Sequence, residues 1–131
     1  MTITIPMRIV SEANLREHWG KKARRVKQQR ALVAIMLPKT DLPPLPVTVT
    51  MTRIAPRKLD KGDNLNIAFK AVRDQIAWQM TWIGVRVMNA KRHIADDSDP
   101  RVEWRYAQEC GEPKYYGVRI EIEPQIGKGK T

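Results

Sequence analysis

Cysteine, histidine and long apolar runs are scarce in this 131-residue chain. The single cysteine, Cys110, excludes an internal disulfide, and the two histidines, His18 and His93, leave no Cys/His zinc pattern. No window approaches the roughly 18 consecutive apolar residues of a membrane helix. The first residues, MTITIPMRIV, lack the charged start, apolar run and cleavage site of a signal peptide. We therefore expect a cytoplasmic protein with no membrane partner, in which any bound metal is a hard cation on oxygen ligands.

Negative charge is also sparse, because 14 acidic residues oppose 24 lysines and arginines and leave a net charge of +10. A polyanion is the expected partner, since Lys and Arg gain affinity by releasing counterions from phosphates. The excess is concentrated between residues 16 and 30, where Glu17 is the one acid. A solvated helix face would have the same composition. If this segment binds DNA, the expected contacts are Lys21, Lys22, Arg24, Arg25 and Lys27.

The residues that are plentiful indicate one folded domain. The chain is 42% hydrophobic and 29% charged, and its length allows one real core but is short for two. We predict a single domain over residues 1–131, with a proline-rich connection at 38–46 and a flexible tail at 125–131.

Alternating apolar residues predict four strands, at residues 2–10, 47–54, 101–108 and 115–123. Pro6 suits an edge position for the first of them. The segment ECGEPK between the last two has the composition of a turn. We therefore predict that the last two strands form an antiparallel hairpin.

Helical periodicity predicts two main helices between these strands. The first covers residues 11–36 and is expected to bury Leu15, Trp19 and Val26. The second runs from Asn64 to at least Ala77 and is expected to bury one face, made of Leu65, Ala68, Phe69, Val72 and Ile76. The predicted fold class is α/β of the α+β type, with a small mixed sheet.

Acidic residues gather in one region of this basic chain. Six aspartates fall within forty residues, namely Asp60, Asp63, Asp74, Asp96, Asp97 and Asp99. At about 100° per residue, Asp63, Lys70 and Asp74 align opposite the buried face of the second helix, and Ile67 shares their line. Two acids and a lysine are therefore expected to face one space.

Each of these residues also has a purely structural explanation. Asp63 is a good N-cap, Lys70 and Asp74 have the spacing of an exposed ion pair, and the later aspartates suit loops. Together, however, convergent carboxylates suit Mg²⁺, and a nearby lysine can stabilise charge on a phosphate in transfer. A divalent cation would also keep the adjacent Asp96 and Asp97 both ionised.

The arrangement resembles the RusA family of Holliday junction resolvases, in its phage and prophage branch. The resemblance is carried by DN, a helix with KAVRD, then DDSDPRVEW and the terminal strands, and it extends over nearly the whole chain. It implies a small α/β subunit that forms a homodimer, binds Mg²⁺ and cleaves four-way DNA junctions in a bacterial host. Mn²⁺ is a possible substitute for the magnesium.

The resemblance also implies a set of site residues. Asp63 and Asn64 match the end of the D-x-D-N motif, and Asp96 and Asp97 match the later acid pair. The implied metal ligands are Asp60, Asp63, Asp96 and Asp97. The implied catalytic residues are Asp63, Asp97 and Lys70, and Asn64 joins the DNA contacts.

The chain departs from the family pattern at three places. The first acid of the motif falls on Lys61, so Asp60 is the nearest carboxylate. The family lysine falls on Ile67, and Lys70 follows three residues later on the same face. A long segment after Asp74 includes Trp78 and Trp82, for which a dimer interface and ordinary core packing are the two interpretations.

Three functions therefore remain open at the level of sequence. The first is a Mg²⁺-dependent endonuclease for branched DNA. The second is a non-catalytic DNA-binding relative with the same scaffold. The third is a small phage assembly or interaction protein whose positive charge contacts acidic partners. The acids matched by the resemblance favour the first function.

Overall fold

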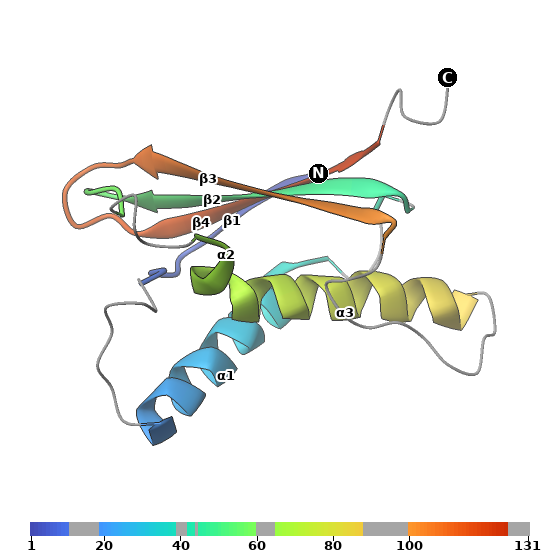
Figure 1. Ribbon diagram of the computed structural model, residues 1–131, viewed down its shortest axis with the longest axis horizontal. Coiled ribbons are helices and arrows are strands. Elements are labelled where there is room, and N and C mark those ends of the chain that lie inside the picture. Colours follow the sequence, from blue (N-terminus) through green and yellow to red (C-terminus); the bar gives the residue numbers. More distant parts are fainter. Residues whose placement is uncertain (11–18, 39–41, 44, 60–64, 88–99, 126–131) are drawn as a thin grey trace.

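The computed structural model describes residues 1–10, 19–38, 42–43, 45–59, 65–87 and 100–125, with side chains in the last helix described to residue 80 (Figure 1). Its elements are β1 (Thr2–Ile5), α1 (Trp19–Met36), β2 (Val47–Ala55), α2 (Leu65–Ala68), α3 (Lys70–Val87), β3 (Val102–Cys110) and β4 (Gly117–Pro124). They form a mixed four-stranded sheet with the helices on one face, which confirms the predicted α+β class (Figure 1). None of the described helices is long and apolar enough to cross a membrane.

The strand order is β1-β4-β2-β3. β2 pairs in parallel with β3, because α2 and α3 carry the chain back between them, as a parallel pair requires. β4 pairs antiparallel with both β2 and β1. β1 ends at Ile5, directly before Pro6, and lies at the edge of the sheet as predicted.

The predicted hairpin of the last two strands is wrong, because β2 lies between β3 and β4. The connection at 111–116 instead passes the end of β2, where the Gly111 N–H donates to the Ala55 carbonyl at 2.8 Å. A Cβ on Gly111 would lie 2.9 Å from Cγ2 of Ile54, closer than ordinary contacts allow. Six residues span two strand spacings of about 4.8 Å each without strain, so the turn composition does not specify direct pairing.

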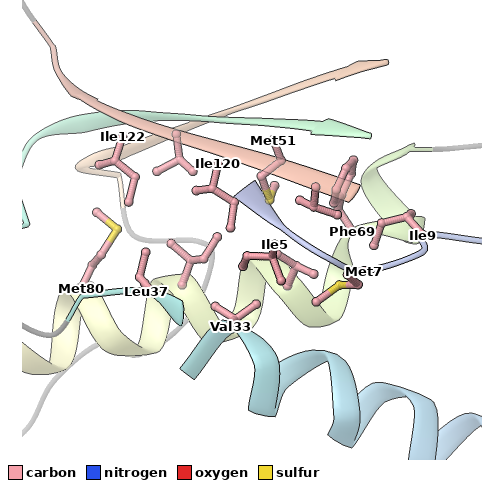
Figure 2. Close-up of a cluster of buried hydrophobic side chains, with 14 of the residues drawn as sticks. Ile5, Met7, Ile9, Val33, Leu37, Met51, Phe69, Met80, Ile120 and Ile122 are labelled. Carbon is pink, nitrogen blue, oxygen red and sulfur yellow. The ribbon is translucent and has the colours of Figure 1, made fainter. Parts of the chain in front are cut away.

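The core lies between the sheet and the helices (Figure 2). Met51 from β2 and Ile120 and Ile122 from β4 face the helices and are fully buried. Phe69 and Met80 pack against them from the helical layer. The predicted buried face of the second helix is confirmed at Ala68, Phe69, Val72 and Ile76, while Leu65 is partly buried.

The second helix is divided at Phe69 into α2 and α3. The hydrogen bonding continues through the division, because Phe69 N–H donates to the Leu65 carbonyl at 2.9 Å and Arg73 N–H donates to the Phe69 carbonyl at 2.8 Å. Residues on either side therefore keep nearly their helical spacing. This keeps Ile67, Lys70 and Asp74 close to one line.

The fully buried residues of α1 lie in its C-terminal half. Its buried residues are Gln29 and Val33, and Leu37 just beyond it is buried as well. Trp19, which the sequence predicts to be buried, is 77% exposed. That prediction is wrong because Trp19 precedes Gln29 by about 15 Å along the axis, where α1 diverges from α3 (Figure 1). Leu15 lies outside the described residues.

The proline-rich connection and the end of β4 meet at the start of β2. The described residues of the connection are non-helical, as predicted, and include a cis Leu45–Pro46 bond. Gln125, the first residue of the predicted tail, donates through Nε2 to the Val47 carbonyl at 2.7 Å. Residues 126–131 lie outside the described part of the chain.

Candidate functional site

A groove runs between α1 and the start of α3. Its walls are Lys22, Val26 and Arg30 from α1, and Ile67, Lys70, Ala71 and Asp74 from α2 and α3. Its volume is about 150 Å³, which is below the roughly 300 Å³ of a pocket for a drug-sized ligand. The groove can therefore admit a phosphate group but not a whole small-molecule cofactor.

A polar contact between α1 and α3 fixes one side of this groove. The Arg30 side chain donates through Nε to Oε1 of Gln75 at 3.1 Å, and Gln75 donates through Nε2 to Oε1 of Gln79 at 3.0 Å. Gln29, Gln75 and Gln79 are all buried. The Arg30–Gln75 bond joins the two helices, and a slip between them would leave the buried Gln75 side-chain oxygen without this donor. Arg30 is thus held in the wall of the groove.

Lys70 and Asp74 form the ion pair that their spacing predicts. The Lys70 Nζ lies 3.0 Å from Oδ1 of Asp74, and the side chains are 56% and 29% exposed. Ile67, half exposed, lies beside them in the groove wall. An exposed pair of this kind is worth only tenths of a kcal/mol. A phosphate that enters the groove can therefore compete with Asp74 for the lysine at small cost.

The predicted DNA contacts of α1 divide between two sides of the helix. Lys21, Lys22, Arg24 and Lys27 are exposed, and Arg25 is partly exposed. Of these, Lys22 lines the groove. The structure therefore brings Lys22, a predicted DNA contact, together with Lys70, a predicted catalytic residue.

Arg30 belongs to the basic segment at 16–30, but it was not among the DNA contacts predicted from the sequence. It follows Lys22 by eight residues and Val26 by four, so all three lie on one helical face. That spacing is a signal present in the sequence. Its meaning depends on α3 lying opposite, which the spacing alone does not reveal.

The predicted metal ligands lie outside the described residues, as does Asn64. They are Asp60, Asp63, Asp96 and Asp97. Within the described ranges, no group of three His, Cys, Asp or Glu side chains is arranged to hold a metal ion. Carboxylates are the ligands that Mg²⁺ prefers, so the donor chemistry of the predicted set fits this metal.

The described residues that flank these acids are anchored to β3. Leu59 N–H donates to Oε1 of Gln108 at 2.7 Å, and the Tyr106 hydroxyl donates to Oδ1 of Asn66 at 3.1 Å. The segment at 60–64 is therefore bracketed by two bonds to β3. The second acidic segment leads directly into β3 through Pro100.

Two arginines that contribute to the net charge are buried and have structural roles. Arg53 donates through Nε to the Ile9 carbonyl at 2.9 Å. Arg73, 9% exposed, donates to both Asn66 and the Tyr106 hydroxyl, and the Tyr106 ring stacks on Phe69 with centroids 6.0 Å apart. This cluster docks the start of α2 on β3. Neither arginine belongs to the basic surface.

The face of the sheet opposite the helices has a different charge balance. Residues between the core positions of β3 and β4 point to this face, and four are acidic against two arginines: Glu103, Glu109, Glu121, Glu123, Arg105 and Arg119. Both arginines are paired, to Glu103 at 2.8 Å and to Glu109 at 2.9 Å. The basic surface is therefore confined to the helical side among these elements.

The Glu109–Arg119 pair is bidentate, with Nη1 to Oε1 at 3.1 Å and Nη2 to Oε2 at 2.9 Å. The hydrogen bond and charge of Arg119 lower the pKa of Glu109, and the same contact raises the pKa of Arg119. A second cavity of about 310 Å³ adjoins this pair. Its other lining residues include Glu112 and Tyr115, so its charge does not favour phosphate.

Comparisons of the chain with protein-family models, with characterised proteins and with solved structures give no match. The interpretation of the groove therefore depends on its own residues.

Proposed function

We propose that this chain is a Mg²⁺-dependent endodeoxyribonuclease that resolves four-way DNA junctions. The main support is the groove in which Lys22, Arg30 and Lys70 surround one depression, with Asp74 as the single acid among the described lining residues. Three cations around a space of phosphate size attract the DNA backbone. The open face of the sheet lacks such an excess, so DNA is expected on the helical side.

Each group has a chemical role in this proposal. Asp63 and Asp97, with Asp60 and Asp96, would hold the magnesium or a substituting Mn²⁺. The bound ion would supply Lewis-acid catalysis of phosphodiester hydrolysis. Lys70 exchanges Asp74 for a phosphate oxygen and stabilises the negative charge that develops there. Lys22 and Arg30 hold the adjoining backbone.

The proposal includes a homodimer in a bacterial host, encoded by a phage or prophage, as in the family that the sequence resembles. Two cuts placed symmetrically across a four-way junction require two sites related by a two-fold axis. A second copy of the chain would supply the second groove.

The test is a cleavage assay on a synthetic four-way junction, with and without Mg²⁺. Cleavage should require the metal and should fall by orders of magnitude in Asp97→Asn and Asp63→Asn, because each loses a ligand and a charge. Junction binding should persist in both variants, which separates loss of chemistry from loss of folding.

The other two functions predict different results. Metal-independent binding without cleavage by the wild-type protein would identify a non-catalytic DNA-binding relative. Failure to bind DNA at low salt would leave an assembly or interaction protein.

A further inference from the structure

Trp19 is more exposed than any other aromatic residue whose side chain is described, at 77%. Tryptophan is seldom left this open to water, because burying its large ring is favourable. A single exposed apolar residue carries little information on its own. Its position on α1 is what makes this residue informative.

Trp19 lies on the same face of α1 as the groove residues. It precedes Lys22 by three residues, Val26 by seven and Arg30 by eleven, which is the spacing of one helical stripe. The rise of 1.5 Å per residue places it about 4.5 Å before Lys22 along the axis. A strand that follows the groove past Lys22 therefore reaches the indole ring next.

The charge around Trp19 suits a nucleic acid strand. The helix from Trp19 to Met36 contains no acidic residue. Lys21 and Lys22 lie two and three residues after Trp19. A positively charged groove that ends at an aromatic ring is the arrangement by which proteins bind single strands, since every unpaired base has a face to stack. Bases within a duplex are already stacked on their neighbours.

We infer that Trp19 stacks on an unpaired base of a DNA strand whose phosphates lie between Lys22, Arg30 and Lys70. This inference rests on the DNA binding proposed above but does not require cleavage. It assigns to the chain a preference for DNA with unpaired nucleotides over continuous duplex.

The test measures DNA binding in EDTA by fluorescence anisotropy, so that cleavage cannot contribute. The probes are a labelled single-stranded oligonucleotide, the same strand with abasic sites, and its duplex. Trp19→Ala should bind the single strand about tenfold more weakly and the duplex within about twofold of wild type. Trp19→Phe should recover most of the lost affinity, because a smaller ring still stacks.

The abasic probe isolates the ring–base contact. Wild type should lose on this probe about what Trp19→Ala loses on the intact strand, and Trp19→Ala should lose nothing further. Ile35→Ala is the matched control, since Ile35 is equally exposed at 78% on the same helix but lies roughly 160° away around it. It should bind all three probes like wild type.

Two outcomes would overturn the inference. Equal losses on single strand and duplex would make Trp19 a structural or charge-related residue, and an unchanged single-strand affinity would exclude stacking. If the wild-type chain binds none of these probes but binds a four-way junction in EDTA, only this inference fails, and if it does not bind the junction either, the proposed function fails as well. A Trp19-dependent preference in a chain that never cleaves junctions would instead overturn only the nuclease proposal.

Discussion

Lys70, at the start of α3, forms a weak ion pair with Asp74. Its 3.0 Å contact with Asp74 is solvent-exposed, so it contributes little to the stability of the fold. The same exposure makes the ammonium available to a phosphate in the groove. The structural and catalytic interpretations of this lysine therefore predict different kinetics.

We expect Lys70→Ala to slow single-turnover cleavage of a four-way junction by about 100-fold, because a positive charge at the reacting phosphate is lost. The apparent affinity for Mg²⁺ should change little. Asp74→Asn is the matched control, and it should retain most activity because Lys70 keeps its charge. Equal and small effects of both substitutions would mean that Lys70 forms an exposed ion pair with Asp74 and has no catalytic role.

At the same scale, Glu109 provides a test of the structure that is independent of DNA. Arg119 lowers the pKa of Glu109. A carboxylate with a lowered pKa in the folded state stabilises the fold above its unfolded pKa, and this contribution disappears as the pH falls through the folded value. We expect NMR titration to give a lower midpoint for Glu109 in wild type than in Arg119→Gln. Identical midpoints would contradict the bidentate contact.

At the scale of elements, the two halves of α1 differ in burial. Its C-terminal half is joined to α3 by the Arg30–Gln75 hydrogen bond and carries the buried Val33. Its N-terminal half, from Trp19 to Gln28, has no buried residue. Charged side chains on an unburied half can contact a ligand without disturbing the core, so their substitution should affect binding and leave stability almost unchanged.

The salt dependence of DNA binding tests this half of α1. Lys22→Ala combined with Lys27→Ala should weaken binding to all DNA shapes and lower the slope of log K against log salt by about 0.9 for each phosphate that the variant no longer neutralises. Arg105→Ala is the control, because Arg105 is an exposed arginine on the opposite face of the sheet, paired with Glu103. An unchanged slope in the α1 variant would show that Lys22 and Lys27 do not contact DNA phosphates.

At the scale of the whole molecule, the two faces of the sheet differ in charge. The helical side carries the basic half of α1 and the groove, while the open face carries more acids than arginines. If the chain binds DNA as proposed, a long DNA arm should therefore lie on the helical side. Such polarity also leaves the opposite side available for other contacts without competition from DNA.

We expect a homodimer of about twice the 15.1 kDa chain mass in light scattering at micromolar concentration. Trp78, 40% exposed on α3, is the described residue of the predicted interface, so Trp78→Ser should shift the mass toward the monomer. Ile35→Ser, on α1, serves as the control. A wild-type protein with only monomer-sized particles would contradict the dimer.

The sequence determined those features that depend on local periodicity. The alternation in 47–54 and the repeat of Ala68, Phe69, Val72 and Ile76 specify which side of each element is apolar, because side-chain direction follows from backbone geometry within a few residues. The pairing of Lys70 with Asp74 is likewise local, since four residues make about one helical turn. The preference of the aspartate carboxylates for a hard cation such as Mg²⁺ likewise follows from residue type alone.

Tertiary structure alone decided which elements are neighbours. The sequence between β3 and β4 suits a turn, yet β2 lies between these strands, because pairing across the chain depends on the whole sheet and not on the turn. The exposure of Trp19 and the meeting of Arg30 with Lys70 depend on where α3 crosses α1. Local periodicity identifies which residues share one side of a helix. Tertiary packing decides which other element lies against that side, because each helix is buried over only part of its length.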